Sequence, residues 1–212
     1  MLYLLKGNFQ KVIRWLAGSW MSANLATVLG CVFIVLSAAA FYFGLAGAGL
    51  RWLLLLVPVF LLFRMAMNAL DGLLSREYGT ATAAGEVWNE TFDIFGDTVS
   101  YGILYFVPGG PKLAIMIFII LTWAAEYYGV LGKGMPGGKR RHEALGGGKA
   151  DRAFWMGLLA FLVFFNPDLF RFANYYIAVV SCLVALTCVI RIRKIMQAAD
   201  GQKYESFTLI GR

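Results

Sequence analysis

Long apolar stretches make up most of the chain, and short segments that contain most of its charges separate them. Each stretch is long enough to cross the roughly 30 Å hydrocarbon core of a bilayer as a helix. We expect six transmembrane helices, at residues 24–46, 52–71, 87–107, 113–131, 153–170 and 173–191. The pattern therefore predicts an all-α, polytopic membrane protein.

The first twenty residues follow a different pattern. Apolar residues recur there at helical spacing, with Lys6, Lys11 and Arg14 between them. This arrangement is typical of an amphipathic helix that lies in the membrane interface, and the segment lacks the compact apolar run and cleavage site of a signal peptide. We expect three parts: an interfacial helix (1–20), a six-helix transmembrane domain (21–194) and a cytoplasmic tail (195–212).

Composition and charge agree with this interpretation. Hydrophobic residues make up 60% of the chain and charged residues only 15%, which excludes an ordinary soluble domain. Fifteen Lys and Arg residues fall on the side of the N-terminus, against Arg51, Lys112 and Arg171 on the other side. Because basic residues in short loops favour the cytoplasm, we expect the N-terminus to be cytoplasmic. The net charge of +7 reflects this topology and attraction to anionic lipids, and no aromatic and basic surface indicates a nucleic-acid partner.

Polar residues interrupt the second and third apolar stretches. A charged side chain near a membrane core costs about 2.5 to 3.5 kcal/mol on insertion scales, so such a group needs an ion, a partner or a water-filled cavity. In the second stretch Arg64, Asn68 and Asp71 share one helical face. Gly72 and Ser75 extend this face with small side chains.

The third stretch has a matching stripe at three- and four-residue spacing, formed by Glu86, Asn89, Glu90, Asp93 and Asp97. We expect Asp71 to close the second helix, Asn89 to open the third, and a short polar loop (77–84) to join them, so that the two stripes face each other near the cytoplasmic surface. Gly85 adds a third small residue that lets the backbones approach or leaves space for a ligand.

The chemistry of these stripes favours a hard cation. Asp, Glu and Asn oxygens are the ligands of Mg²⁺ and Mn²⁺, which commonly share their coordination with substrate phosphates. The alternative is that the acids form structural ion pairs with Arg64 and Arg76. The sequence thus predicts either a phosphate-handling metal site or a buried ion-pair network.

The same residues resemble a known signature, that of the CDP-alcohol phosphotransferases (CDP-alcohol phosphatidyltransferases): Asp-x2-Asp-Gly-x2-Ala-Arg-x8-Gly-x3-Asp-x3-Asp. Residues at the right separations are Asp71, Gly72, Arg76, Gly85 and Asp93. The departures are Asn68 and Asn89 for the first and third Asp, and Ser75 for Ala. A bacterial branch of the family with both Asn residues resembles the chain more closely still.

The resemblance continues outside the signature. Ala23-Asn24-Leu25-Ala26-Thr27 resembles the Pro-Asn-x-x-Thr that usually precedes the first span in the family. Gly148-Lys149 resembles the residues with which the fifth span of the family begins. The resemblance implies six transmembrane helices, a homodimer, a polar cavity open to the cytoplasm and a two-metal site. The two Asn residues remove two negative charges from that site. The implied location is a bacterial cytoplasmic (inner) membrane.

The resemblance also implies a reaction. An alcohol hydroxyl attacks the phosphorus beside the lipid half of CDP-diacylglycerol, in the presence of Mg²⁺ or Mn²⁺, and CMP leaves. The implied metal ligands are Asp71, Asn68, Asn89 and Asp93, with Asp93 also the general base; Glu90 is a further ligand that we add as a hypothesis. The implied donor-binding residues are Gly72, Ser75, Arg76 and Gly85.

Glu90 and Asp97 adjoin the signature. We hypothesise that Glu90 replaces one charge lost at Asn68 or Asn89; the alternative is a solvated acid favoured by the helix dipole. Asp97 is one turn deeper and either restores the second charge or pairs with Arg64.

A flexible, basic segment (132–152) ends at the start of a helix. Backbone N–H groups there, with Lys149 and Arg152 nearby, can receive a phosphate of the acceptor or donor; ordinary positive-inside topology explains the charge equally well. Together with Arg64 and Asp97, these residues are candidate contacts for acceptor or phosphate.

Three alternative functions remain open from the sequence. One is transfer from a soluble CDP-alcohol to diacylglycerol, and another is a member that binds lipid nucleotide without catalysis. The third is a small ion-coupled transporter, which the one-sided clustering of the acids and the lack of an internal repeat disfavour.

Overall fold

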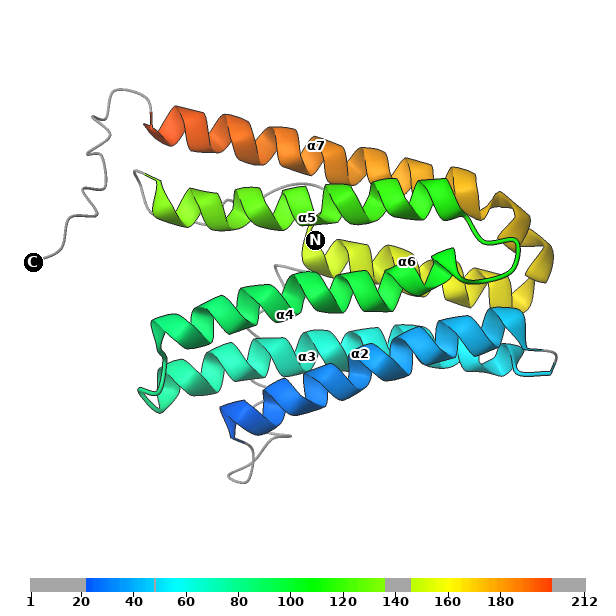
Figure 1. Cartoon of the computed structure of the whole chain (residues 1–212), viewed down its shortest axis with the longest axis horizontal. Coiled ribbons are helices and arrows are strands. Elements are labelled where there is room, and N and C mark those ends of the chain that lie inside the picture. The colour runs from blue at the N-terminus through cyan, green and yellow to red at the C-terminus, as the bar shows by residue number, and fades with distance from the viewer. Residues whose placement is uncertain (1–21, 48, 136–145, 200–212) are drawn as a thin grey trace, which may run out of the picture.

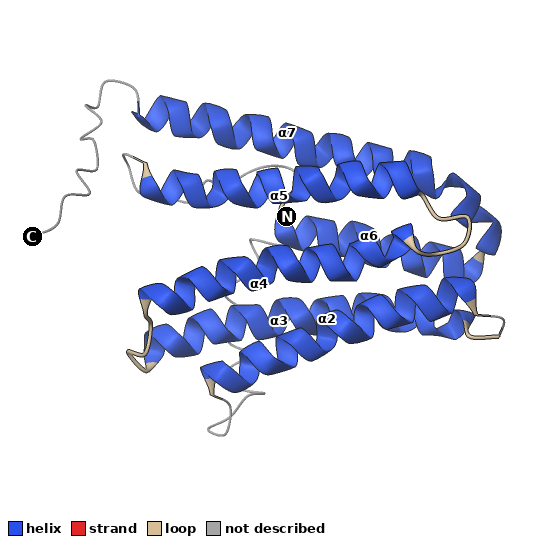
Figure 2. Cartoon of the chain, viewed as in Figure 1, coloured by secondary structure: helices blue, strands red, loops and turns tan. Residues whose placement is uncertain are grey.

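The computed structural model describes residues 22–47, 49–135 and 146–199. The expected interfacial helix (1–20), the middle of the basic segment (136–145) and most of the expected tail (200–212) lie outside the described residues. The long helices are α2 (Ala23–Ala46), α3 (Leu56–Glu77), α4 (Ala83–Gly102), α5 (Lys112–Gly134), α6 (Lys149–Phe165) and α7 (Ala173–Ala199). Short 3-10 helices are η2 (Arg51–Leu55), η3 (Ile103–Tyr105) and η4 (Pro167–Phe172). The described residues contain no strand (Figure 2), so the all-α prediction is confirmed.

Local sequence signals set the helix starts. The Ser22 hydroxyl accepts a hydrogen bond from Leu25 N (3.2 Å) at the start of α2, and Thr82 accepts one from Gly85 N (3.0 Å) at the start of α4. At the start of α6 the Asp151 carboxylate accepts from Gly148 N at 3.3 Å.

Within the described residues, four helical stretches are long and apolar enough to cross a membrane: 23–46, 51–76, 112–134 and 167–199. The helices α4 and α6 lie at the other two expected positions but are outside this set. α4 contains the acidic stripe, and α6 has only 17 residues. Both pack against apolar helices, and their deepest charged groups, Asp97 on α4 and Arg152 on α6, are buried in protein. The chain is therefore a multi-span helical membrane protein.

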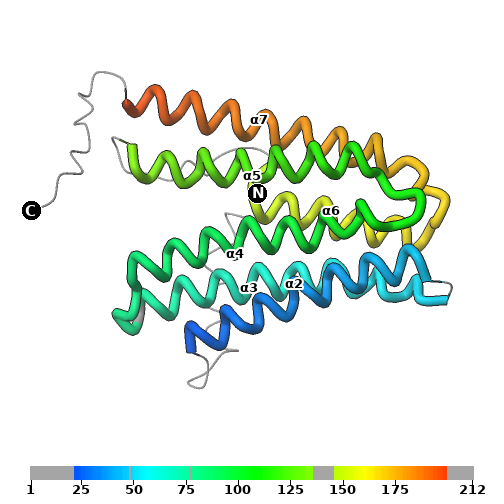
Figure 3. Tube along the Cα trace, in the orientation of Figure 1, coloured from blue at the N-terminus to red at the C-terminus, as the bar shows by residue number. Residues whose placement is uncertain are grey.

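Successive helices alternate in direction (Figure 1). The start of α2, the α3–α4 connection and the ends of α5 and α7 lie toward one end of the bundle, and the trace in Figure 3 follows the same alternation. These described helix ends, for which the sequence predicts a cytoplasmic location, therefore share one end. The apolar core, which includes Phe41, Leu54, Tyr101, Phe118 and Ile177, joins all six helices.

Two helix boundaries differ from the sequence prediction. Asp71 does not close its helix, because α3 continues to Glu77, and Asn89 does not open the next, because α4 begins at Ala83. The connection is residues 78–82, shorter than the expected loop. Hydropathy marks where apolar character ends, whereas the Thr82 cap and the polar turns of α3 and α4 continue the helices beyond that point. The signature residues consequently lie within rigid helical turns.

Gly96 permits a close contact inside the bundle. A Cβ at this position of α4 would lie 2.6 Å from Arg64 Nη2 and 2.6 Å from Ile34 Cδ1. The guanidinium of Arg64 therefore reaches α4 through space that only a glycine leaves open.

We predict that Gly96→Ala destabilises the protein by about 1 to 3 kcal/mol, as overpacking of a filled core does. Thermal unfolding of the detergent-purified protein measures this loss. Gly102→Ala is the matched control on the same helix, because a Cβ there meets nothing within 4 Å. Equal melting temperatures for both variants would contradict the role of Gly96.

Candidate active site at the α3–α4 helix ends

The two polar stripes meet. Asn68 Nδ2 on α3 donates a hydrogen bond of 2.6 Å to Asp93 Oδ1 on α4. Asn68 is partly buried and Asp93 is 5% exposed. The stripes of the second and third helices therefore face each other, as the sequence predicts.

Asp71 lies one turn from Asn68 and is held from a third helix. Thr27 Oγ1 on α2 donates to Asp71 Oδ2 at 2.6 Å. The second oxygen, Oδ1, accepts no hydrogen bond from the residues that the structure describes. Thr27 thus fixes the carboxylate while one oxygen stays available to a ligand.

Asp93 has a cationic partner from α6. Lys149 Nζ forms an ion pair with Asp93 Oδ1, the oxygen that also accepts from Asn68. The Lys149 side chain is 19% exposed, and that of Asp93 is 8% exposed. The start of α6 is thereby placed against the signature, although 56 residues separate the two.

A buried ion network lies one turn deeper. Asp97 Oδ1 pairs with Arg64 Nη1 at 2.6 Å, and Asp97 Oδ2 accepts from Arg152 Nη2 at 2.7 Å and Nε at 3.2 Å. Arg152 Nη2 also pairs with Glu126 Oε1 on α5 at 2.7 Å. All four side chains are at most 3% exposed. The sequence analysis gives the Arg64–Asp97 pair as one of two alternatives for Asp97, and it does not single out Glu126.

The network is connected to the signature at two points. Arg64 Nη2 donates to the backbone carbonyl of Asp93 at 3.2 Å, and Arg152 Nη1 donates to the carbonyl of Gly147 at 3.1 Å. Gly147 comes two residues before Lys149. The network therefore holds both members of the Lys149–Asp93 ion pair through their backbones.

Glu90 lies toward α5. Its Oε1 pairs with Lys133 Nζ at 3.1 Å, and the same ammonium contacts Glu86 Oε1. The Glu90 side chain is 12% exposed and that of Glu86 is 55% exposed. This triad joins the start of α4 to the end of α5.

The remaining signature residues lie along the open side of the two helices. Asn89 is partly exposed on the second turn of α4, and Ser75 is partly exposed on α3. The guanidinium of Arg76 lies over Gly72, where an added Cβ would be 3.5 Å from Nη1. Gly85 is exposed in the first turn of α4. Arg76 is therefore beside the signature and accessible to an anion.

The donor atoms fit a hard divalent cation. Asp71 Oδ1, the second oxygen of Asp93 and the amide of Asn89 belong to the same pair of helices, and all are ligands that Mg²⁺ and Mn²⁺ accept. Within the described ranges no three His, Cys, Asp or Glu side chains form a metal cluster. The residues fit an ion that takes few protein ligands and completes its shell with substrate phosphates.

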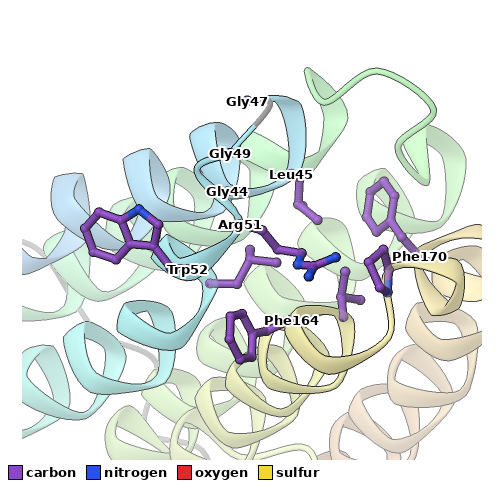
Figure 4. A pocket seen from close by; sticks show the side chains of 11 residues that line it. Gly44, Leu45, Gly47, Gly49, Arg51, Trp52, Phe164 and Phe170 are labelled. Carbon is purple, nitrogen blue, oxygen red and sulfur yellow. The ribbon is translucent and has the colours of Figure 1, made fainter.

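A cavity of about 610 Å³ lies at the opposite end of the bundle, between the α2–η2 and α6–η4 connections (Figure 4). Arg51, Trp52, Phe164 and Phe170 contribute to its wall, and the Arg51 guanidinium is 6.0 Å from the centre of the Phe164 ring. None of the signature residues lines it.

Fold and site together define a helical membrane protein in which Asp, Glu and Asn side chains gather on facing turns of α3 and α4. The sequence model of the CDP-alcohol phosphatidyltransferase family matches residues 20–192. The chain belongs to this family, whose members transfer substituted phosphate groups in phospholipid biosynthesis and depend on divalent metals.

One curated relative is the inner membrane protein YnbA of Escherichia coli (strain K12). It is 31% identical over 199 residues, which is 92% of this chain and 96% of the relative. The fold is similar to two crystal structures of the phosphatidylinositol phosphate synthase PgsA1 of Mycobacterium tuberculosis, both 18% identical to this chain.

The PgsA1 structure with CDP-DAG bound has a TM-score of 0.66 and covers 92% of this chain and 98% of its own. The structure with manganese and citrate has a TM-score of 0.67, and the match covers 92% of this chain and 93% of the PgsA1 chain.

We predict that Asp97→Asn lowers stability by about 3 to 5 kcal/mol, because buried Arg64 loses its charged partner and buried Arg152 keeps only Glu126. Unfolding of the purified protein in detergent measures this loss. Asp168→Asn, at an exposed position of η4, is the matched control with the same change of side chain. A melting temperature of Asp97→Asn within one degree of the control would show that the network contributes nothing to stability.

Proposed function

We propose that the protein transfers a phosphatidyl group from CDP-diacylglycerol to an alcohol acceptor and releases CMP. The observation that carries this proposal is the Asn68–Asp93 contact, because it brings the two halves of the signature into one site. Family membership supports the reaction type. The similar fold of PgsA1, which was solved with CDP-DAG bound, supports the donor.

In this proposal Asp93 is the general base. The acceptor hydroxyl oxygen attacks the phosphorus of the phosphatidyl half, the bond from that phosphorus to the bridging oxygen breaks, and CMP takes the bonding electrons. The hydroxyl proton goes to the free oxygen of Asp93. Position beside the acceptor qualifies Asp93 for this role, since its Oδ1 is already held by Asn68 and Lys149.

Asp71 is the proposed principal ligand of Mg²⁺ or Mn²⁺, with Asn89 and Glu90 as further ligands. When bound, the ion would neutralise negative charge on the diphosphate of the donor. Asn68, which the sequence analysis includes among the ligands, donates its amide to Asp93 instead. We therefore assign Asn68 the role of orienting the base.

The donor contacts follow from the open side of the two helices. Arg76 is placed to pair with a donor phosphate, because its guanidinium is exposed beside Gly72. Gly72, Ser75 and Gly85 leave room for the cytidine and its ribose.

Lys149 is the proposed contact to the acceptor or its phosphate, because it is the partly exposed cation beside Asp93. Arg64, Asp97 and Arg152 are buried and form ion pairs with one another and with Glu126. We propose that these three position the site and leave substrate contact to Lys149 and Arg76.

The inner membrane location of YnbA supports a bacterial inner membrane for this chain. We propose that the end of the bundle with the signature faces the cytoplasm, where CMP is released. We also propose that two copies of the chain form a homodimer.

The direct test incubates the purified protein with CDP-diacylglycerol labelled in its lipid half, Mn²⁺ or Mg²⁺ and a panel of alcohols. We expect CMP release together with a labelled phospholipid. Conversion of labelled diacylglycerol into labelled phospholipid with a soluble CDP-alcohol, and no reaction of CDP-diacylglycerol, would favour the reverse choice of substrates. Nucleotide binding without CMP release would contradict catalysis.

We predict that Asp71→Asn and Asp93→Asn each lower the rate of CMP release at least about 100-fold, as loss of a metal ligand or a general base does. Asp168→Asn, far from the signature in sequence and exposed, should retain the rate. Activity of Asp93→Asn above a tenth of the unmodified protein would eliminate Asp93 as the base.

Glu90→Gln tests the proposed ligand role against the ion pair with Lys133. We predict that the Mn²⁺ concentration for half-maximal activity rises at least about tenfold, because a carboxylate ligand becomes an amide. Glu86→Gln is the matched control, since Glu86 shares Lys133 but is far more exposed. Equal shifts in both variants would assign Glu90 to the α4–α5 contact alone.

A further inference from the structure

We infer that the site takes one divalent cation per chain, and that the Lys149 ammonium supplies the second positive charge at Asp93. This inference rests on the proposed function and concerns how the site balances charge. The structural basis is the shared contact of Asn68 and Lys149 with one carboxylate oxygen.

Asn68 is oriented as a donor. Its Nδ2 lies 2.6 Å from Asp93 Oδ1, and its Oδ1 is directed toward α2, where a Cβ on Gly30 would lie 3.3 Å from it. The amide oxygen thus packs against the Gly30 backbone, away from Asp93. A cation bridging Asn68 and Asp93 would have to displace both contacts.

Lys149 occupies the remaining approach to this oxygen. Its ammonium is in contact with Asp93 Oδ1, and the backbone on both sides is fixed by the Arg64–Asp97–Arg152 network. A divalent cation at the same oxygen would meet a like charge at contact distance, which is strongly unfavourable. Asp93 Oδ1 is therefore satisfied by protein groups before any ion binds.

Asp71 has the opposite environment. Its partner Thr27 is a neutral hydroxyl, and its Oδ1 accepts no hydrogen bond from the described part of the chain. Two amides at positions 68 and 89 provide two fewer negative charges than carboxylates would, and Lys149 adds one positive charge. The cluster is thereby suited to a single divalent ion on the Asp71 side.

The test counts Mn²⁺ bound to the detergent-purified full chain by electron paramagnetic resonance and elemental analysis. We expect one Mn²⁺ per chain in the unmodified protein. Lys149→Met should expose Asp93 and raise the count to two, with spin coupling between the ions. Lys149→Arg retains the charge and should keep a count of one.

Arg193→Met, an exposed loss of charge on α7, is the control and should keep one ion. Two ions in the unmodified protein, or one ion in both Lys149→Met and Lys149→Arg, would overturn the inference. The Mn²⁺ count of the unmodified protein does not depend on any variant. Circular dichroism verifies that each variant is folded.

Failure of this inference is distinct from failure of the proposed function. If the unmodified protein binds two Mn²⁺ and releases CMP, the proposed transferase function stands and only the proposed role of Lys149 is wrong. Absence of CMP release with every metal and alcohol would remove the function itself, whatever the ion count.

Discussion

The bundle depends on Asp97, a carboxylate with both oxygens committed to arginines on other helices. Arg64 on α3 and Arg152 on α6 approach it from two sides, and Arg152 continues to Glu126 on α5. Burying unpaired charges is costly, so each member requires the others. Association of apolar helices within lipid has little directional preference, whereas this network has one geometry. It therefore specifies how α3, α4, α5 and α6 are rotated against one another.

The site is built on that rotation. Arg64 holds the backbone of Asp93, and Arg152 holds the backbone just before Lys149, so the ion pair between these two residues is positioned by the network one turn deeper. Thr27 adds α2 by orienting Asp71. Small residues make the approach possible: Gly96 leaves space for Arg64, and a Cβ at Gly147 would lie 2.2 Å from Thr187 Oγ1 on α7. Residues that hold the helices together and residues of the proposed site thus alternate along the same helices.

Much of this arrangement is predictable from the sequence. Each of the six expected stretches overlaps one long helix. Three- and four-residue spacing places Asn68 and Asp93 on facing stripes and gives the Arg64–Asp97 pair as one alternative. Spacing works here because α3 and α4 are joined by a five-residue connection, which leaves few ways to pack them. Helix boundaries are less predictable, because capping by Thr82 and not hydropathy decides where α4 begins.

Spacing does not predict the contacts between helices that lie far apart in the sequence. Thr27 and Asp71 are 44 residues apart, and Lys149 and Asp93 are 56 apart; periodicity gives the face of each helix but not its partner. Glu126 is the clearest case, since a single acid in an apolar stretch has no spacing partner. Its charge is nevertheless a usable signal, because a carboxylate within a span requires a buried cation. Many basic residues lie within or beside the spans, and among the residues that it describes the structure buries three of their side chains, those of Arg64, Arg152 and Arg191. The sequence therefore indicates that Glu126 has a basic partner, but the structure is needed to identify that partner as Arg152 at the start of α6.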